Sequence, residues 1–540
     1  MPPIAHAVAG LLTFALAFSL VGYFRHKSDP GYTDDGWIHL TFARNLAETG
    51  RLTYGDGVWT PGSTAPLWTV LLAAGFFVGT NETWWPWMVD ALCLGLAGLA
   101  AVWLLASVAR HRPCADGVRC EAASGRPRSV EVHPWASFAL RWCCAATLVS
   151  SGPLVWSAAG AMEVPLTIAL ILAAVALFQH HSGRPRRAAA AWGACAGLAA
   201  LCRPECLIVA IILGGLECSR GREHRFVRTL PGWGACALVY SPSVILGLAA
   251  TGLPFPNTFY AKATALVEGA PDPAFIAGAL AVFRDVAPHA GGLFVLGGAM
   301  VLAGVGRGRV PLGMIACAAF AIALPLAYAS MGRTAHFVGL AGVGGRYLFP
   351  MIGPMLVVGF WGVEALMTRV VRRGLRLCIG AVVILAVAAP AGDLPAIART
   401  FAHQVWDTQV MQVAMADFLR DRLLDDATVA ANDVGALGFR TSFRVVDLVG
   451  LVSNDVMAAL RAARGQGRQP EAALMDVLRL RRPDALLIFP RWYPDLLREL
   501  EPGLEFMGKI HNEQNITSAD ALMVAYRIDW EKIGSNAVME

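Results

Sequence analysis

The chain has 540 residues, of which 56% are hydrophobic and only 15% charged, and its mean hydropathy is +0.53. Soluble domains carry about 25% charged residues, so this composition excludes a soluble protein and indicates a polytopic membrane protein. The net charge of +5 comes largely from arginines in short loops. Such a distribution indicates membrane topology and a lipid bilayer as partner, rather than nucleic acid.

Apolar segments recur along the first 391 residues, at 4–24, 65–79, 87–109, 135–157, 162–179, 188–202, 204–218, 230–250, 289–306, 310–329, 346–367 and 377–391. If every segment crossed the membrane, the arginine-rich loop 110–133 would share a side with Asp34 and Asp35. If 65–79 does not cross, the five basic loops at 110–133, 180–187, 219–228, 307–309 and 368–376 become cytoplasmic, as the positive-inside rule favours, and only the cluster 25–27 lies outside. Fifteen helical residues reach only about 22 Å, short of the roughly 30 Å hydrocarbon core. The sequence therefore predicts an α-helical polytopic membrane protein with about eleven transmembrane helices.

Residues from Ala391 onward differ from the rest, because charged residues return. Helical and strand-like patterns alternate there, with helices at 408–424 and 470–482 and strands at 428–431, 445–451, 485–489 and 522–528. About 150 residues suffice for one small soluble α/β domain. An odd number of spans from a cytoplasmic N-terminus places this tail outside. We therefore expect a transmembrane catalytic domain at 1–391 and an extracytoplasmic α/β domain at 392–540.

The stretch from Tyr32 to Trp68 follows the first apolar run and holds two adjacent carboxylates, Asp34 and Asp35. A buried charge near hydrocarbon costs several kcal/mol, so acidic residues at the membrane edge are functional candidates. The residues behind them have the amphipathic pattern of a helix that lies along the interface. We expect an extracytoplasmic loop at 25–86 that carries both carboxylates. The structural alternative for Asp34 is a helix N-cap.

The same stretch, DDGWIHLTFARNLAETGRLTYGDGVWTPGSTAPLW (34–68), resembles the first extracytoplasmic loop of GT-C glycosyltransferases that use polyprenyl-phosphate sugars. Its Asp-Asp, Arg-Asn-Leu and Gly-x-x-x-Pro-Leu-Trp pattern is similar to that of the mycobacterial terminal arabinofuranosyltransferases. Further resembling pieces follow in family order, namely AMEVP (161–165), CRPE (202–205), PNTFYAK (256–262) and GRY (345–347). The resemblance implies a GT-C transmembrane domain.

Transfer from a polyprenyl-phosphate sugar requires a carboxylate that takes a proton from the attacking hydroxyl. It also requires cations that stabilise the leaving phosphate. The resemblance implies that the loop aspartate is the catalytic base or a metal contact, so Asp34 and Asp35 are the catalytic candidates. Asp34 is the favoured candidate of the two, because it stands where the leading aspartate of the family stands. We expect only one of the two neighbours to face the donor, since adjacent side chains point in different directions.

The candidate substrate-binding residues come from the resembling motifs and the outer loops, and they are Arg44, Glu163, Arg203, Glu205, Asn257, Tyr260, Lys262, His336 and Arg346. For the arginines, the structural alternative is a snorkelling anchor at a helix end. Asp34, Asp35 and Glu163 also supply the oxygen ligands that divalent cations prefer. The sequence leaves open whether the protein uses such a cofactor.

The predicted function is that of an integral-membrane glycosyltransferase of the inner or plasma membrane, with its active site outside. By resemblance, it moves arabinofuranose from a polyprenyl-phosphate donor to an extracytoplasmic glycan in cell wall biogenesis. The stretch around 53–63 departs from the arabinofuranosyl pattern, because YGDG and WTP replace the usual Asn-Pro-Gly-Glu run and GST (62–64) replaces Glu-Gly-Tyr-Thr. A mannosyl- or aminosugar-type GT-C transferase acting on lipid, glycan or protein is therefore an alternative. A polytopic lipid or sugar transporter is disfavoured, since the acidic pair lies at one membrane edge.

Overall fold

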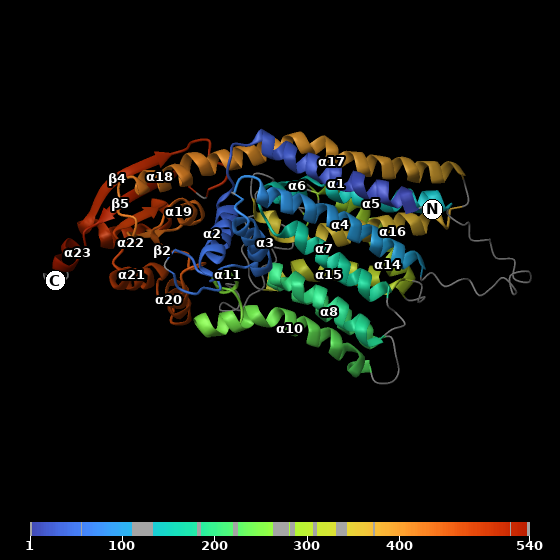
Figure 1. Ribbon diagram of the computed structural model, residues 1–540, viewed down its shortest axis with the longest axis horizontal. Coiled ribbons are helices and arrows are strands. Elements are labelled where there is room, and N and C mark those ends of the chain that lie inside the picture. The colour runs from blue at the N-terminus through green and yellow to red at the C-terminus, as the bar shows by residue number, and fades with distance from the viewer. Residues whose placement is uncertain are drawn as a thin grey trace, which may run out of the picture.

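The computed structural model describes residues 3–536 apart from 56, 81, 111–132, 181–184, 220–224, 263–279, 281–283, 285–286, 306–309, 331–342, 371–372 and 519. Long helices form a bundle, and a mixed α/β unit built from the C-terminal residues covers one end of it (Figure 1). Two shorter helices, α2 (Asp34–Thr49) and α3 (Pro66–Phe77), lie where the two parts meet.

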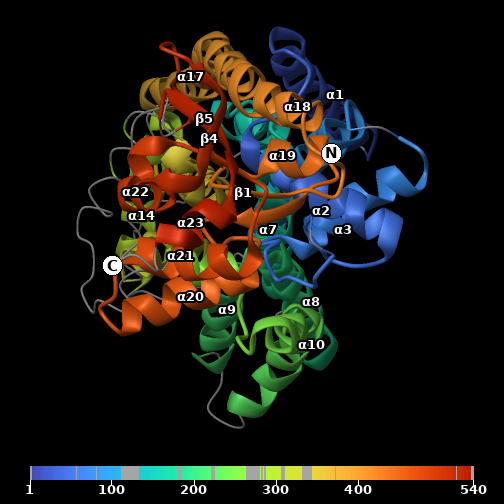
Figure 2. The same cartoon turned by 90° about the vertical axis from the view of Figure 1, so that its left-hand side faces the viewer.

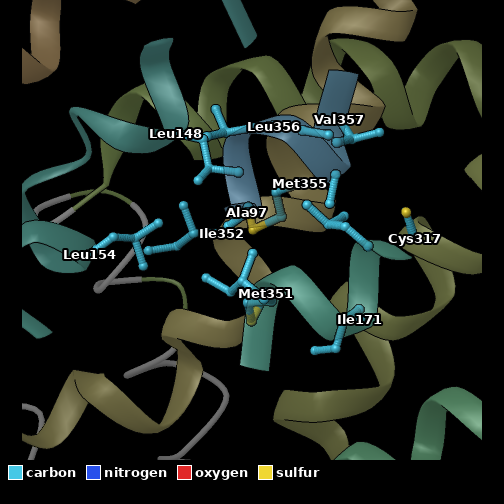
Figure 3. Packing of buried hydrophobic residues seen from close by; sticks show 14 of the residues in the cluster. Ala97, Leu148, Leu154, Ile171, Cys317, Met351, Ile352, Met355, Leu356 and Val357 are labelled. Carbon is cyan, nitrogen blue, oxygen red and sulfur yellow. The ribbon is translucent and has the colours of Figure 1, made fainter. Parts of the chain in front are cut away.

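The other helices before the sheet are α1 (Pro3–Lys27), α4 (Trp85–Arg110), α5 (Pro134–Val149), α6 (Gly152–Ala159), α7 (Val164–His180), α8 (Pro185–Cys202), α9 (Leu207–Ser219), α10 (Arg225–Thr251), α11 (Asn257–Lys262), α14 (Pro288–Val305), α15 (Leu312–Ser330), α16 (Ile352–Met367) and α17 (Arg373–Thr408). The most buried of the long apolar segments is Gly345–Met367, which contains α16 and is 94% buried, against 17% for α1. In Figure 3, Met355 and Leu356 of α16 lie among side chains of neighbouring helices, including Leu148 and Ile171. Such close packing fixes α16 as the centre of the bundle.

Seven of the described helices are long and apolar enough to cross a membrane, or eight if the bent pair α5–α6 forms one span. The chain is thus an α-helical multi-pass membrane protein, as predicted, while the number of about eleven spans stays a prediction. The apolar segment 65–79 forms α3, which has only 12 residues. At 1.5 Å per residue this helix reaches about 18 Å, too short to cross the hydrocarbon core.

Two interruptions of helical structure place polar residues at the end of the bundle that the α/β unit covers. Helix α8 ends at Cys202, and a short 3₁₀ turn, η2 (Pro204–Cys206), begins two residues later. Proline restricts the preceding residue to extended backbone, and Arg203 has φ −152° and ψ 114°. Between α6 and α7, the backbone of Ala161 has a φ of 58°. These breaks leave Arg203 and Glu163 outside regular helices.

The C-terminal unit contains a five-stranded sheet in the order β2-β1-β3-β5-β4. Strand β1 is parallel to β2 and β3, whereas β5 is antiparallel to β3 and β4. The strands are β1 (Thr428–Ala431), β2 (Arg444–Asp447), β3 (Ala485–Ile488), β4 (Leu504–His511) and β5 (Leu522–Ile528). The predicted α/β character is confirmed. Strand β4 was not predicted, because it lies at the sheet edge and its mostly half-buried or exposed residues show no clean alternation.

Helices cover both faces of this sheet, and they are α18 (Ala414–Arg420), α19 (Gly435–Arg440), α20 (Asn454–Gly465), α21 (Pro470–Arg481), α22 (Pro494–Leu500) and α23 (Trp530–Asn536). Successive strand residues point to opposite faces. Val429 therefore packs towards α18 and α19, while Ala430 packs towards α20, α21 and α22. The first of these two cores also contains Phe42 of α2 and Tyr54 of the loop that follows it.

The C-terminal unit is docked on the α2 region through close backbone contacts, and α2 lies beside α19 when the molecule is seen from this end (Figure 2). The hydroxyl of Tyr54 donates to the carbonyl of Val434 at 2.7 Å. A Cβ added to Gly435 would clash with the backbone of Asp34, so this approach requires glycine. Helix α17 continues through residue 391 without a break, which ties the unit to the bundle along the chain as well.

Candidate functional site

A cavity lies where the bundle meets the C-terminal unit. Its lining comes from seven chain segments, and the residues are Asp35, Ile38, His39, Gly62, Ser63, Thr64, Met162, Glu163, Arg203, Pro204, Glu205, Pro256, Thr258, Phe259, Arg346, Tyr347, Leu451 and Val452. Its volume of about 90 Å³ is smaller than the roughly 300–1,000 Å³ of most ligand pockets. A sugar ring therefore requires that one wall moves, and Leu451 with Val452 forms the wall contributed by the C-terminal unit.

Asp35 lies in the first turn of α2 and forms an ion pair with Arg346. The dipole of α2 favours a carboxylate at this position. Arg346 belongs to the 3₁₀ segment η3 (Val343–Met351), which leads into the buried helix α16. The exposed fractions of the two side chains are 30% for Asp35 and 17% for Arg346, so both remain accessible from the cavity.

Arg203 is held by two carboxylates and a phenol. Its Nη1 donates to Glu163 Oε1 at 2.8 Å, and its Nε donates to Glu205 Oε1 at 2.6 Å. Its Nη2 donates to the hydroxyl of Tyr328 at 3.2 Å, and that hydroxyl in turn donates to Glu205. Such charge-assisted bonds offset the cost of burying the guanidinium group. The helix break before Pro204 thus places the guanidinium group of Arg203 in a fixed position at the cavity wall.

His39 is one helical turn beyond Asp35 on α2 and is buried. Its Nε2 lies 3.3 Å from Glu163 Oε2. Although burial raises the pKa of the Glu163 carboxyl, its contacts with His39 and Arg203 lower it to about 2. Glu163 is therefore a permanent anion that links α2 to the Arg203 turn.

Asp34 has different surroundings from Asp35, and its side chain does not line the cavity. Its Oδ1 accepts a hydrogen bond from the backbone N–H of Ala436 in α19 at 3.3 Å. Burial, together with the nearby carboxylates of Asp433 and Asp35, raises the pKa of Asp34 well above its usual range. The structure thus brings Asp35 to the cavity, whereas the sequence favoured Asp34.

The C-terminal unit brings two further aspartates near the site. Burial raises the pKa of Asp433 to about 6, and its Oδ2 accepts from Gln412 at 2.8 Å. Burial also raises the pKa of Asp447 to about 6. Its carboxylate accepts from the backbone N–H groups of Val449 at 2.9 Å and Val452 at 2.9 Å, and from that of Leu451. Asp447 thereby fixes the segment that closes the cavity.

Five of the sequence candidates meet at this cavity, namely Asp35, Glu163, Arg203, Glu205 and Arg346. Arg44 lies outside, where its Nη1 donates to the carbonyl of Phe439 at 2.6 Å and its Nη2 to that of Gly438 at 3.0 Å. Asn257 lies behind the wall and donates from Nδ2 to Asn454 Oδ1 at 2.9 Å.

Tyr260 lies beside Arg461, whose guanidinium is 5.4 Å from the ring centroid. The side chain of Lys262 and the whole of His336 lie outside the described residues.

The three carboxylates considered as metal ligands do not converge. Asp35 pairs with Arg346, Glu163 pairs with Arg203, and Asp34 faces the backbone of α19. Among the residues that the structure describes, no three His, Cys, Asp or Glu side chains are grouped so that they could hold a metal ion. The described side chains therefore do not fit a metal centre.

Several site residues escaped the sequence analysis. His39 has the i, i+4 spacing from Asp35 that places both on one helix face, and this spacing could have identified it. Tyr328 lies in an apolar stretch with no distinguishing pattern, whereas Tyr347 belongs to the GRY motif (345–347) but was not among the candidate residues. Leu451 and Val452 come from the C-terminal unit, and no local signal indicates that they cover a site in the other part of the chain.

The fold defined by this bundle, its end cavity and the C-terminal unit is that of the GT-C glycosyltransferases, as the motifs predicted. The chain is similar to ArnT from Cupriavidus metallidurans bound to undecaprenyl phosphate, with 12% identity over 96% of this chain and 97% of that chain and a TM-score of 0.56. It is also similar to the oligosaccharyltransferase from Archaeoglobus fulgidus in the apo form, with 13% identity over 97% and 74% of the two chains and a TM-score of 0.54.

A structure of the arabinofuranosyltransferase AftD from Mycobacteria matches with 17% identity over 98% of this chain and 40% of that chain, at a TM-score of 0.43, which is too low to support an argument. A family profile described as a domain of unknown function (DUF8728) matches residues 402–537. No curated protein matches the chain in sequence.

Proposed function

We propose that this protein is a membrane glycosyltransferase that transfers a sugar from a polyprenyl-phosphate donor to an acceptor outside the cytoplasm. The observation that carries the proposal is the Asp35–Arg346 ion pair in a cavity at the end of the helical bundle. A carboxylate and a cation side by side are the two groups that this transfer needs. The GT-C fold and the undecaprenyl phosphate bound to ArnT support the choice of donor.

Donor binding and activation of the base are coupled in this scheme. The lining holds the carboxylates Asp35, Glu163 and Glu205 against the guanidinium groups of Arg203 and Arg346. An incoming lipid phosphate therefore competes with Asp35 for Arg346. When the phosphate takes over this contact, Asp35 loses its counterion and becomes a stronger base.

The chemical step then follows from these positions. Asp35 takes the proton of the acceptor hydroxyl, and the oxygen of that hydroxyl bonds to the anomeric carbon of the donor sugar. The bond from that carbon to the phosphate oxygen breaks, and the phosphate leaves with the electron pair, stabilised by Arg346. Arg203 forms ion pairs with Glu163 and Glu205. We propose that these two acids bind the sugar hydroxyls and that Arg203 holds them in place. Asp34 positions α2 against the C-terminal unit.

The remaining assignments extend the same proposal. We place the cavity and residues 392–540 on the extracytoplasmic side, in the inner or plasma membrane, because the basic loops then face the cytoplasm. Arabinofuranose is the sugar that the loop motif supports, and a cell-envelope glycan is the acceptor. A mannosyl- or aminosugar-type donor is the alternative to be tested in the same assay.

The test measures binding of undecaprenyl phosphate to the purified protein in detergent. Arg346→Gln should weaken binding about ten- to a hundredfold, because a charge-assisted contact contributes roughly 1.5–3 kcal/mol. Arg440→Gln is the matched control, since Arg440 pairs with Asp417 away from the cavity. The donor is then identified by release of undecaprenyl phosphate from undecaprenyl-phosphate arabinofuranose, mannose and aminosugars. Wild-type protein that neither binds undecaprenyl phosphate nor releases it from any donor would rule out the proposed function.

A further inference from the structure

A second hollow lies directly behind one wall of the cavity. Pro256 and Val452 line the cavity, whereas Leu253 and Asn454, which are close to them in the chain, line a separate groove. This groove runs between the end of α10 and helix α20, and its lining is Ala250, Thr251, Leu253, Asn454, Asp455, Met457, Ala458, Arg461 and Ala462. Its volume of about 590 Å³ falls within the usual range for ligand pockets.

The groove continues along α20 past α11. A smaller hollow there shares Met457 and Arg461 with it and adds Tyr260 and Arg464. The guanidinium of Arg461 lies 5.4 Å from the ring centroid of Tyr260. Together these side chains form a path from the cavity wall to the surface of the C-terminal unit.

The charge along this path is uneven. Asp455 is paired with Arg481, whose Nε lies 2.7 Å from Asp455 Oδ2. Arg461 and Arg464 form no ion pair with any residue that the structure describes. The groove therefore presents two uncompensated cations beside an aromatic ring, a combination that suits anionic groups and the faces of sugar rings.

The wall between the two hollows contains polar atoms that have no protein partner. Asn257 is completely buried and Thr258 is 7% exposed. Asn257 Oδ1 and Thr258 Oγ1 are both buried without a hydrogen-bond partner among the described residues. A buried polar atom without a partner costs about 1–3 kcal/mol. Thr258 lines the cavity, so a polar ligand that enters there can complete the bonding of its hydroxyl.

We propose that the groove formed by α10, α11 and α20 binds the acceptor, and that this acceptor is a carbohydrate chain bearing phosphate or carboxylate groups. The proposal rests on the proposed function. The end of the chain enters the cavity past Thr258, where its hydroxyl meets Asp35 and the donor sugar. Its anionic groups contact Arg461 and Arg464, and one of its rings lies against Tyr260.

The groove is tested by blocking it. Ala458 lines the groove and is exposed, so an Ala458→Cys variant can be coupled to a polyethylene-glycol maleimide. Transfer to an envelope glycan fraction should fall at least tenfold after coupling, while the Kd for undecaprenyl phosphate stays unchanged. The matched control is a Gln466→Cys variant treated in the same way, because Gln466 is exposed at the end of α20 and outside the groove. Labelled wild-type protein controls for the natural cysteines.

The charge assignment has its own test. Arg461→Gln and Arg464→Gln should each raise the KM for the glycan fraction about tenfold, the lower end of what a charge-assisted contact contributes. Raising the ionic strength should raise this KM in the wild type and much less in the double variant. An unchanged KM in both variants, or undiminished transfer by the labelled Ala458→Cys variant, overturns the proposal. Weaker binding of undecaprenyl phosphate by the labelled Ala458→Cys variant or by the arginine variants overturns the proposal as well, since the groove would then bind the lipid. Wild-type protein that releases no lipid phosphate contradicts the proposed function instead.

Discussion

Two neighbouring residues, Asp34 and Asp35, lie in two different regions of the molecule. Asp35 faces the cavity and pairs with Arg346 from the helical bundle. Asp34 faces the C-terminal unit, where it accepts from the backbone of Ala436 and lies near Asp433. Both aspartates begin α2, and consecutive helix residues point about 100° apart. One turn of helix thus contacts both the predicted reaction centre and the docking interface.

This difference shows how the surroundings of two chemically identical side chains decide which of them can take up a proton. A carboxylate beside a guanidinium group stays ionised and is available for chemistry when that partner is taken by a ligand. A carboxylate buried against backbone and other carboxylates favours its neutral form, which suits packing better than proton transfer. The predictions that follow separate the two regions by experiment.

The largest effect is expected for Asp35→Asn. This change keeps the shape of the side chain and removes its ability to accept a proton. Release of undecaprenyl phosphate from the active donor should fall by a factor on the order of 10² to 10⁴, the usual contribution of a positioned general base. The melting temperature should change little. Turnover within a factor of three of the wild type would show that Asp35 is not the base, and Glu163 and Glu205 would then be the next acids to examine.

A smaller effect, on stability, is expected at the docking interface. The pKa of Asp433 is raised from its ordinary 3.8 to about 6, so the folded protein holds this proton more tightly than the unfolded chain. This contribution is fully present below pH 3.8 and is lost as the pH rises through about 6. Asparagine carries no charge at any pH, so Asp433→Asn avoids this loss of stability. The variant should be more stable than the wild type at pH 7.5 by up to about 3 kcal/mol.

The measurement for Asp433 is the melting temperature of wild type and variant between pH 4 and pH 7.5. The variant should melt higher than the wild type at pH 7.5, and the difference should disappear near pH 4. Gln412 donates to Asp433, and an asparagine can still accept this bond. A difference between the two proteins that does not vary with pH would contradict the assigned origin of the effect.

The smallest effect is expected for Asp34→Asn. Asparagine can accept from Ala436 as the carboxyl does, and it resembles the neutral form that burial favours. Donor turnover should stay within about threefold of the wild type, because Asp34 supplies no proton acceptor to the cavity. A loss as large as that of Asp35→Asn would instead assign Asp34 to the reaction. Measuring both single variants and the double variant in one assay decides between these outcomes.

The architecture was predictable because it depends on patterns along the chain. Apolar segments too long for a soluble core predicted the helical bundle, and alternating patterns after Ala391 predicted most of the sheet. The helix break at Arg203 follows from Pro204, since proline constrains the residue before it. The segment 65–79 was expected to be too short to span the hydrocarbon core, and α3 has 12 residues. Each of these signals is local, and hydropathy or a single proline is enough to produce it.

The roles of individual side chains were decided only by the tertiary structure. Arg44 belongs to a motif that suggested substrate binding, yet it contacts carbonyl groups of α19. Leu451 and Val452 line the cavity although no pattern marked them. The sequence by itself determined a multi-pass membrane protein with a C-terminal α/β domain and the segments from which a site is built. Which of two adjacent aspartates faces the cavity depends on how α2 is rotated between the bundle and α19, and that rotation is set by packing between residues about 400 positions apart.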